Sequence, residues 1–311
     1  MKNSKRILAL CGGVGGAKLA YGLAKILSED ELTILVNTGD DFEYLDLTIC
    51  PDIDTVSYTL SDINNTKKGW GIRNESWNTL KFLKKYGAEN WFQLGDKDLA
   101  VHLYRTFLLK KGMKLSEVTK LITERLKIKH NIVPMSETPV RTILYTDKGI
   151  FSFQEYFVKH KCKPVVKRIE YSGSKEAVIP KVLKDKLKIN YFNGVIICPS
   201  NPYLSIDPIL SIKSIKDFLI KRTFPVLAVS PFINNQAIKG PSAKIARELN
   251  DKPTNKSIIN HYQGILDRLV VNYQDYKESE YLSIKTLKTT TLMHNNKDKK
   301  ELAKFCLNNL D

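Results

Sequence analysis

The sequence predicts an α/β fold with a doubly wound, mainly parallel sheet, and three features lead to this prediction. Apolar runs alternate with amphipathic segments of helical period, as expected when strands and helices alternate around a parallel sheet. The first apolar run, residues 7–10, continues into glycines and then into an amphipathic run over 17–27. Later apolar runs end in turn-forming residues and are also expected to be strands, at 194–198, 226–230 and 269–271.

A helical region interrupts this alternation. Helices are expected at 77–86, at 96–111 with Asp96 as N-cap, and from about 116 with Ser116 as N-cap. Asp98, His102 and Arg105 share one face of the second helix, and the pattern assigns them no role. Two strands, 140–146 and 150–157, are expected to form a hairpin. We therefore expect a single domain over 1–311 with a helical insert at about 61–130.

Composition limits the class of protein. The 311 residues are 42% hydrophobic and 26% charged, and no apolar run is long enough to span a membrane. Five scattered cysteines without a C-x-x-C pair predict reduced thiols in the cytoplasm. The net charge of +16 comes from dispersed lysines. We expect solvated helix faces, with some steering of a phosphorylated substrate, rather than nucleic-acid binding.

A glycine-rich segment, residues 12–16, follows the first expected strand. Glycines allow a close approach of the backbone to a ligand, and the next helix offers unpaired N–H groups at its N-terminus. We therefore expect Gly13, Gly15, Gly16 and Lys18 to bind a phosphate or nucleotide. The segment matches neither the dinucleotide fingerprint nor the P-loop pattern, and a tight turn without a ligand is the alternative.

Acidic residues are concentrated between residues 40 and 54. Six occur there, although the whole-chain frequency of 33 in 311 would give fewer than two. Carboxylates near a phosphate site suit Mg²⁺, so we expect metal or substrate contact from Asp40, Asp41, Asp52 and Asp54. Helix capping and turn formation also select aspartate and are the alternative.

Two further loops are expected at the same edge of the sheet as the glycine segment. Ser200 and Asn201 follow one strand, and Gly240 lies in the loop after another. The carboxyl ends of parallel strands form the ligand-binding edge of such sheets. These residues are therefore expected to contact phosphate or base, with turn formation alone as the alternative.

Taken together, six motifs resemble those of the 2-phospho-L-lactate transferases of coenzyme F-420 biosynthesis, in the same order and over nearly the whole chain. They are residues 12–18 (GGVGGAK), 37–41 (NTGDD), 50–55 (CPDIDT), 94–98 (LGDKD), 199–202 (PSNP) and 239–241 (KGP). The form of the first motif resembles the bacterial branch of the family.

This resemblance implies a Rossmann-like core, a homodimer and a reaction that requires Mg²⁺. Family members transfer a phospho-three-carbon-acid unit from a guanosine diphospho adduct to the ribityl hydroxyl of the deazaflavin Fo, and GMP leaves. The resemblance implies that Asp54 lies against Fo. Gln93 stands at a second Fo-contacting position, where relatives frequently have lysine. Asp54 and Asp41 are the candidate catalytic residues.

Two other classes of protein are alternatives. A related branch of the superfamily binds nucleotide sugars and is not known to be catalytic, so a nucleotide-sugar-binding regulator is one. The segment 40–43 and the presence of Asp54 and Trp70 favour the transferase. An NAD-dependent oxidoreductase is the other, and the missing third fingerprint glycine disfavours it.

Overall fold

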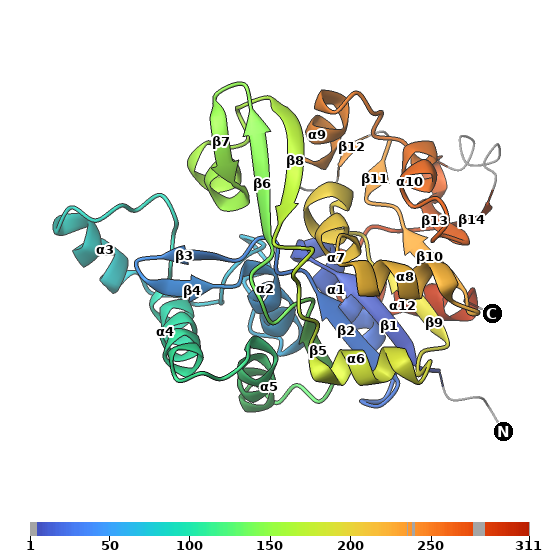
Figure 1. Ribbon diagram of the computed structural model, residues 1–311, viewed down its shortest axis with the longest axis horizontal. Coiled ribbons are helices and arrows are strands. Elements are labelled where there is room, and N and C mark those ends of the chain that lie inside the picture. The colour runs from blue at the N-terminus through green and yellow to red at the C-terminus, as the bar shows by residue number, and fades with distance from the viewer. Residues whose placement is uncertain (1–4, 235, 238–239, 276–283, 311) are drawn as a thin grey trace.

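The computed structural model describes residues 5–234, 236–237, 240–275 and 284–310, and a seven-stranded sheet lies at its centre (Figure 1). All paired neighbours in this sheet run parallel. The strands are β1 (Ile7–Cys11), β2 (Leu32–Val36), β5 (Asn131–Pro134), β9 (Gly194–Ile197), β10 (Val226–Val229), β13 (Arg268–Asn272) and β14 (Lys285–Thr289). This arrangement confirms the predicted α/β class.

The order of the strands is β14-β13-β10-β9-β1-β2-β5. The chain therefore winds from β1 outward through β2 to β5, then returns to β9 beside β1 and winds the other way. This is the doubly wound Rossmann arrangement, and its switch point lies between β1 and β9. Ligands of such sheets bind at the carboxyl ends of the strands on either side of that point.

Helices cover both faces of the sheet because its central strands are apolar on both sides. In β1, Ile7 and Ala9 belong to one core and Leu8 and Leu10 to the other. The first core includes side chains of three helices, α1 (Gly13–Ala24), α2 (Pro51–Leu60) and α12 (Asn296–Asn308). The second core is covered by α6 (Lys181–Lys188), α7 (Asp207–Leu210), α8 (Lys213–Lys221) and α10 (Asn255–His261).

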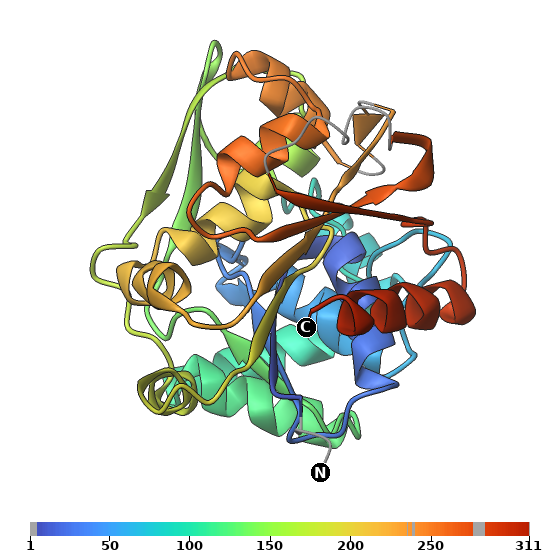
Figure 2. The same ribbon diagram turned by 90° about the vertical axis from the view of Figure 1, so that its right-hand side faces the viewer.

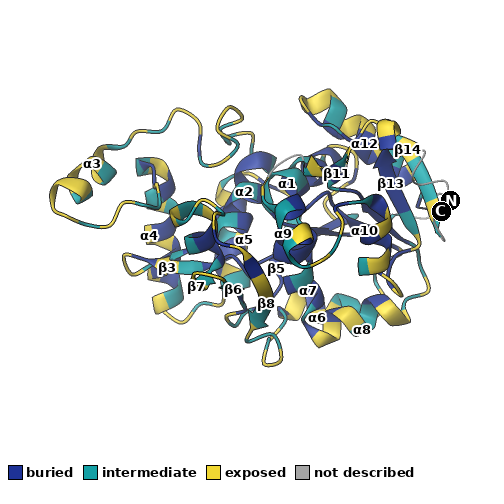
Figure 3. Ribbon diagram, turned by 90° about the horizontal axis from the view of Figure 1, so that it is seen from above, coloured by how far each residue is buried: buried dark blue, intermediate teal, exposed yellow. Residues whose placement is uncertain are grey.

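The segment between α2 and β5 holds the helices expected of the insert. They are α3 (Asn78–Lys85), α4 (Asp96–Lys110) and α5 (Leu115–Arg125). None of the residues in α3 is buried, and the helix stands away from the core (Figure 3). A small antiparallel hairpin, β3 (Phe42–Tyr44) and β4 (Leu47–Ile49), lies before α2.

Two of the predicted helix caps are wrong. Asp96 begins α4, and its carboxylate caps α3 instead, by accepting the N–H groups of Asn78 and Thr79 at 3.0 Å each. Helix α5 begins after Lys114 rather than at Ser116. The local pattern would assign the Asp96 carboxylate to the N-terminus of α4. It is instead used in a tertiary contact with α3.

A second sheet stands on the carboxyl edge of the first (Figure 1). The predicted hairpin is present as β6 (Arg141–Thr146) and β7 (Gly149–Ser152). Its second strand ends at Ser152 rather than at residue 157, because the chain turns into a short π-helix, Glu155–Lys159. A third strand that was not predicted, β8 (Val166–Ser172), pairs with β6. The start of β6 touches the loop after β2, because the N–H of Thr142 donates to the carbonyl of Gly39 at 2.8 Å. The shorter elements are β11 (Phe232–Ile233), β12 (Gln236–Ala237) and α9 (Ser242–Glu248).

In the described part of the chain, no helix has both the length and the apolar character needed to cross a bilayer.

Helices α1 and α12 lie side by side, and a glycine allows their contact (Figure 2). A Cβ added at Gly22 would lie 2.1 Å from the carbonyl oxygen of Lys299. We therefore expect Gly22→Ala to lower the free energy of unfolding by about 1–3 kcal/mol, the usual cost of overpacking. Chemical denaturation measures this change. A gain of about 1 kcal/mol, as helix propensity alone would give, would contradict the close packing.

Candidate functional site

The loops that follow β1 and β9 are joined by hydrogen bonds at the switch point. The N–H of Gly12 donates to Oγ of Ser200 at 3.2 Å, and the Ser200 hydroxyl donates to the carbonyl of Gly12 at 2.9 Å. The side-chain oxygen of Asn201 accepts the N–H groups of Tyr203 and Leu204, and so caps the π-helical turn Pro202–Ile206. Ser200 and Asn201 thus have structural partners, and their contact with a ligand stays a prediction.

The glycine segment is mostly helix rather than loop. Helix α1 begins at Gly13 and ends at Ala24, so the expected start at residue 17 is wrong. A Cβ at Gly15 would lie 2.2 Å from the Pro199 carbonyl oxygen, and one at Gly16 would lie 2.5 Å from Oγ of Ser200. These two glycines let the first turns of α1 pack against the loop after β9. Phosphate contact at Gly13, Gly15 and Gly16 is untested.

A carboxylate lies at the N-terminus of α1. Asp52, in the first turn of α2, accepts the N–H of Gly13 through Oδ1 at 2.6 Å. Its Oδ2 accepts from Nδ2 of Asn37 at 2.9 Å, and the same Nδ2 lies 3.1 Å from Oδ1 of Asp40. Asn37 follows β2 directly, so its amide joins an acid of the loop after β2 to an acid of helix α2. Asn37 stands in the motif 37–41, but no local pattern predicted its role in holding the two acids.

Asp40 and Asp52 are buried beside each other. Burial raises the pKa of Asp40 well above its ordinary value, and the charge of Asp52 raises it further. Burial also raises the pKa of Asp52 to about 6, although the hydrogen bonds from Asn37 and Gly13 oppose this rise. Neither residue forms an ion pair within the described ranges. No cationic side chain of the described residues therefore offsets the charge that this pair carries when it is ionised.

Asp41 lies in a different environment. Burial raises its pKa to about 7, and Arg141, a hydrogen bond from Cys50 and Arg105 all oppose the rise. Its Oδ1 is buried and has no hydrogen-bond partner among the described residues. Asp41 is therefore the member of the group whose ionised form is favoured by the charges of two arginines.

Asp54 is bound from the insert. Arg105 of α4, which is only 1% exposed, donates Nη1 to Oδ2 of Asp54 at 3.0 Å and Nη2 to its Oδ1. Nη1 of Arg105 also lies 3.1 Å from Nδ1 of His102, so the lone pair of Nδ1 faces the guanidinium. This places the imidazole proton on Nε2, 3.3 Å from Oδ1 of Asp98. The hydroxyl of Tyr58 donates to the same oxygen at 2.6 Å.

The ligand atoms of Asp54, Asp98 and His102 are close enough together to hold a metal ion. However, the Arg105 guanidinium already contacts both Asp54 and His102. The residues that share a face of α4 in the sequence therefore form a buried polar network between the insert and α2. A cationic side chain, rather than an ion, balances Asp54 in this network.

The other predicted residues lie elsewhere. Lys18 donates Nζ to the carbonyl of Met293 at 2.6 Å, beside a cavity of about 70 Å³ that Trp70 and Lys299 also line. Gln93 is exposed in the loop before α4. Gly240 precedes α9 with a φ of 72°, and Lys239 of the same motif lies outside the described residues. Their contacts with substrate stay predictions.

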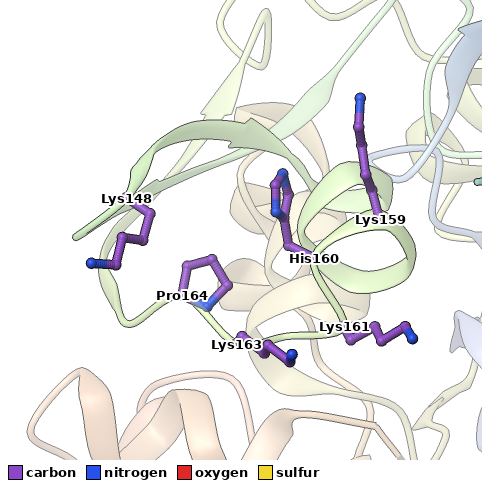
Figure 4. Close-up of a pocket in the computed structure, with 6 residues that line it drawn as sticks. All are labelled: Lys148, Lys159, His160, Lys161, Lys163 and Pro164. Atoms are coloured by element: carbon purple, nitrogen blue, oxygen red, sulfur yellow. The ribbon is translucent and has the colours of Figure 1, made fainter.

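A larger hollow of about 450 Å³ lies on the second sheet and holds none of the predicted residues. It is lined by Lys148, Lys159, His160, Lys161, Lys163 and Pro164. The lysine side chains point in different directions and do not converge on one point (Figure 4). This hollow is therefore not the candidate site.

Comparisons with known proteins identify the family to which this chain is similar. Residues 7–309 match the model of the family 2-phospho-L-lactate transferase CofD. The 2-phospho-L-lactate transferase of Methanopyrus kandleri is 38% identical over 97% of this chain and 96% of its own, and that of Methanosarcina mazei is 36% identical over 96% and 98%. The phosphoenolpyruvate transferase of Mycobacterium leprae is 32% identical over 91% and 92%, which agrees with the bacterial form of the first motif.

A solved structure shares the fold at low sequence identity. A UPF0052-family protein from Bacillus halodurans superposes with a TM-score of 0.65, at 14% identity, over 99% of this chain and 100% of its own. The match of nearly the whole chain to one family model, together with relatives above 30% identity, settles the family. The chain belongs to the 2-phospho-L-lactate transferase family and is a transferase.

Proposed function

We propose that this enzyme transfers a phospho-three-carbon-acid unit from a guanosine diphospho adduct to the terminal ribityl hydroxyl of the deazaflavin Fo, with release of GMP. Membership of the family supports this reaction. The observation that carries the proposal is the group of buried aspartates at the switch point, beside the N-terminus of α1. Phosphoryl transfer depends mainly on placing charge around the reacting group. The buried aspartates place charged side chains at the switch point, where ligands of such sheets bind.

The donor set fits Mg²⁺. Asp40 and Asp52 offer hard oxygen ligands, and their mutual charge is balanced by no side chain in the described residues. Asp41 offers an unpaired buried oxygen. Asp54 is the weakest candidate, because Arg105 contacts both of its oxygens. We propose that Asp40 and Asp52 hold the ion, with Asp41 beside them.

A bound Mg²⁺ would supply positive charge to the phosphoryl oxygens of the donor. The protein's own contribution is to hold the carboxylates. Asn37 fixes the relative position of Asp40 and Asp52 through hydrogen bonds to both. The N–H of Gly13 and the partial positive charge of α1 favour the ionised form of Asp52.

We propose that the acceptor approaches from the side of the insert. Asp54 of α2 faces α4, and Gln93 is exposed in the loop that leads into α4. Asp41, whose pKa burial raises to about 7, is the carboxylate best placed to exchange a proton near neutral pH. A homodimer and a cytoplasmic location remain part of the proposal.

The reaction is tested by mass spectrometry of purified enzyme with Fo, Mg²⁺ and the guanosine diphospho adducts of lactate, enolpyruvate and glycerate. We expect a phospho-acid–Fo product and an equal amount of GMP from at least one adduct, and the preferred adduct identifies the donor. If no adduct reacts while a nucleotide sugar binds tightly, the protein is instead a nucleotide-sugar-binding regulator.

Breaking the Asp54–Arg105 pair should cost stability as well as activity. Asp54→Asn leaves the guanidinium of Arg105 buried without its carboxylate, so we expect the free energy of unfolding to fall by about 3–5 kcal/mol. Urea denaturation measures it. The exposed Glu43→Gln is the control and should change it by less than about 0.5 kcal/mol. Equal stability of both variants would show that the ion pair contributes little.

The raised pKa values predict a pH-dependent effect of Mg²⁺. Asp52 and Asp41 have folded-state pKa values of about 6 and about 7, above the ordinary value of about 3.9. The folded protein therefore binds more protons than the unfolded chain in this range. Without metal, the free energy of unfolding should fall as pH rises from about 4 to 7.

Because Mg²⁺ binds ionised carboxylates, its stabilising effect should be larger at pH 8 than at pH 5. Thermal unfolding with and without the ion measures this difference. Asp52→Asn should abolish most of the Mg²⁺ effect, whereas Asp46→Asn, which changes an exposed acid of the β3–β4 turn, should retain it. The same shift in both variants would place the ion elsewhere.

A further inference from the structure

Arg141, which no sequence pattern singled out, lies beside the loop that carries Asp40 and Asp41. It is the first residue of β6, whose start is fixed to the loop after β2 by the Thr142–Gly39 hydrogen bond (Figure 1). Its Nη1 lies 3.5 Å from the carbonyl oxygen of Thr38 in the same loop. The second sheet thus brings a guanidinium to the carboxyl end of β2.

Only one of the three nitrogens of the Arg141 guanidinium forms hydrogen bonds with the described residues. Its hydrogen bonds are made by Nη1, to the carbonyls of Val140 at 3.1 Å and Thr38 at 3.5 Å. It forms no ion pair within the described ranges, and the residue is half-buried. An arginine has five N–H donors, so the Nε and Nη2 groups remain available to a ligand.

Among the described residues, two other cations near the glycine and aspartate motifs, Arg105 and Lys18, are already engaged. Both terminal nitrogens of Arg105 contact Asp54 inside the protein, and Lys18 donates to Met293. Arg141 instead lies against the loop that carries Asp40 and Asp41 and has donors left, at an edge where an anionic substrate would meet carboxylates.

We propose that Arg141 binds an oxyanion of the donor substrate, either a phosphoryl oxygen or the carboxylate of its three-carbon acid. The planar fork of an arginine matches both groups. This inference rests on the proposed function for the identity of the donor. It assigns the second sheet a direct part in substrate binding.

The test uses full-length Arg141→Gln and Arg141→Lys, with Arg168→Gln as the matched control. Arg168 lies on β8 of the same sheet and pairs with Glu170. Arg168 lies opposite Tyr145 on the paired strand β6. Arg141 lies at the other end of the same strand pair, opposite Ser172. The control removes the same charge away from the aspartates. Thermal unfolding confirms that each variant is folded.

Calorimetry measures binding of GDP and of the donor adduct, both with Mg²⁺. For Arg141→Gln we expect the dissociation constant of the adduct to rise roughly 10- to 100-fold, as for loss of a hydrogen bond to a charged group. Arg141→Lys should lie between this variant and the wild type, and Arg168→Gln should equal the wild type. The KM for Fo should not change.

The two ligands separate the two oxyanions. Weaker binding of both GDP and the adduct assigns Arg141 to a phosphoryl oxygen, and weaker binding of the adduct alone assigns it to the carboxylate. If folded Arg141→Gln binds the adduct within twofold of the wild type, the inference is wrong. Failure of the wild type to react with any adduct would instead overturn the proposed function, independently of these binding results.

Discussion

The hydrogen bond from the N–H of Gly13 to Asp52 is the contact on which the rest of the site depends. It connects the start of α1 with the first turn of α2, and Asn37 extends the connection to Asp40 in the loop after β2. A helix N-terminus normally attracts an anion, and in this chain that anion is a carboxylate of the protein. At the switch point, the carboxylate of Asp52 therefore occupies the helix N-terminus. Many Rossmann proteins leave the N–H groups of this helix free to bind a phosphate. Positive charge for a phosphorylated substrate must then come from other groups.

The charges around the switch point fall into two groups. Asp40 and Asp52 have only amides as described hydrogen-bond donors, and burial together with their mutual repulsion raises the pKa of Asp40. Asp41 and Asp54 lie close to arginines that come from outside the parallel sheet. Arg105 comes from the insert and Arg141 from the second sheet. Each of the two additions to the Rossmann core thus contributes one cation to the acidic edge.

The sequence predicted the parts of the fold that have strong local patterns. The central strands β1, β9 and β10 are buried on both faces and therefore form continuous apolar runs. The edge strand β14, with the sequence KTLKT, is only partly buried and gave no such pattern, and β8 alternates polar and apolar residues too weakly to be predicted. The aspartates were found by their local density, but no local pattern joins them to Arg105 or Arg141, which lie about 50 and 100 residues further along the chain. Those contacts arise from tertiary packing.

The start of α1 at the glycine motif was also not predictable from local sequence, because it depends on tertiary contacts. Glycine has a low helix propensity, so the sequence placed the start of α1 after the glycines, whereas the structure includes three of the four in the helix. A Cβ at Gly12 would lie 2.4 Å from Oδ2 of Asp52, and one at Gly15 would meet the Pro199 carbonyl. The glycines therefore bring α1 close to Asp52 and to the loop after β9. A motif selected for this packing has no reason to follow the spacing of a dinucleotide fingerprint or a P-loop, whose glycines leave backbone N–H groups open to phosphate. Through Gly12 and Gly13, the glycine motif and Asp52 form one packed unit.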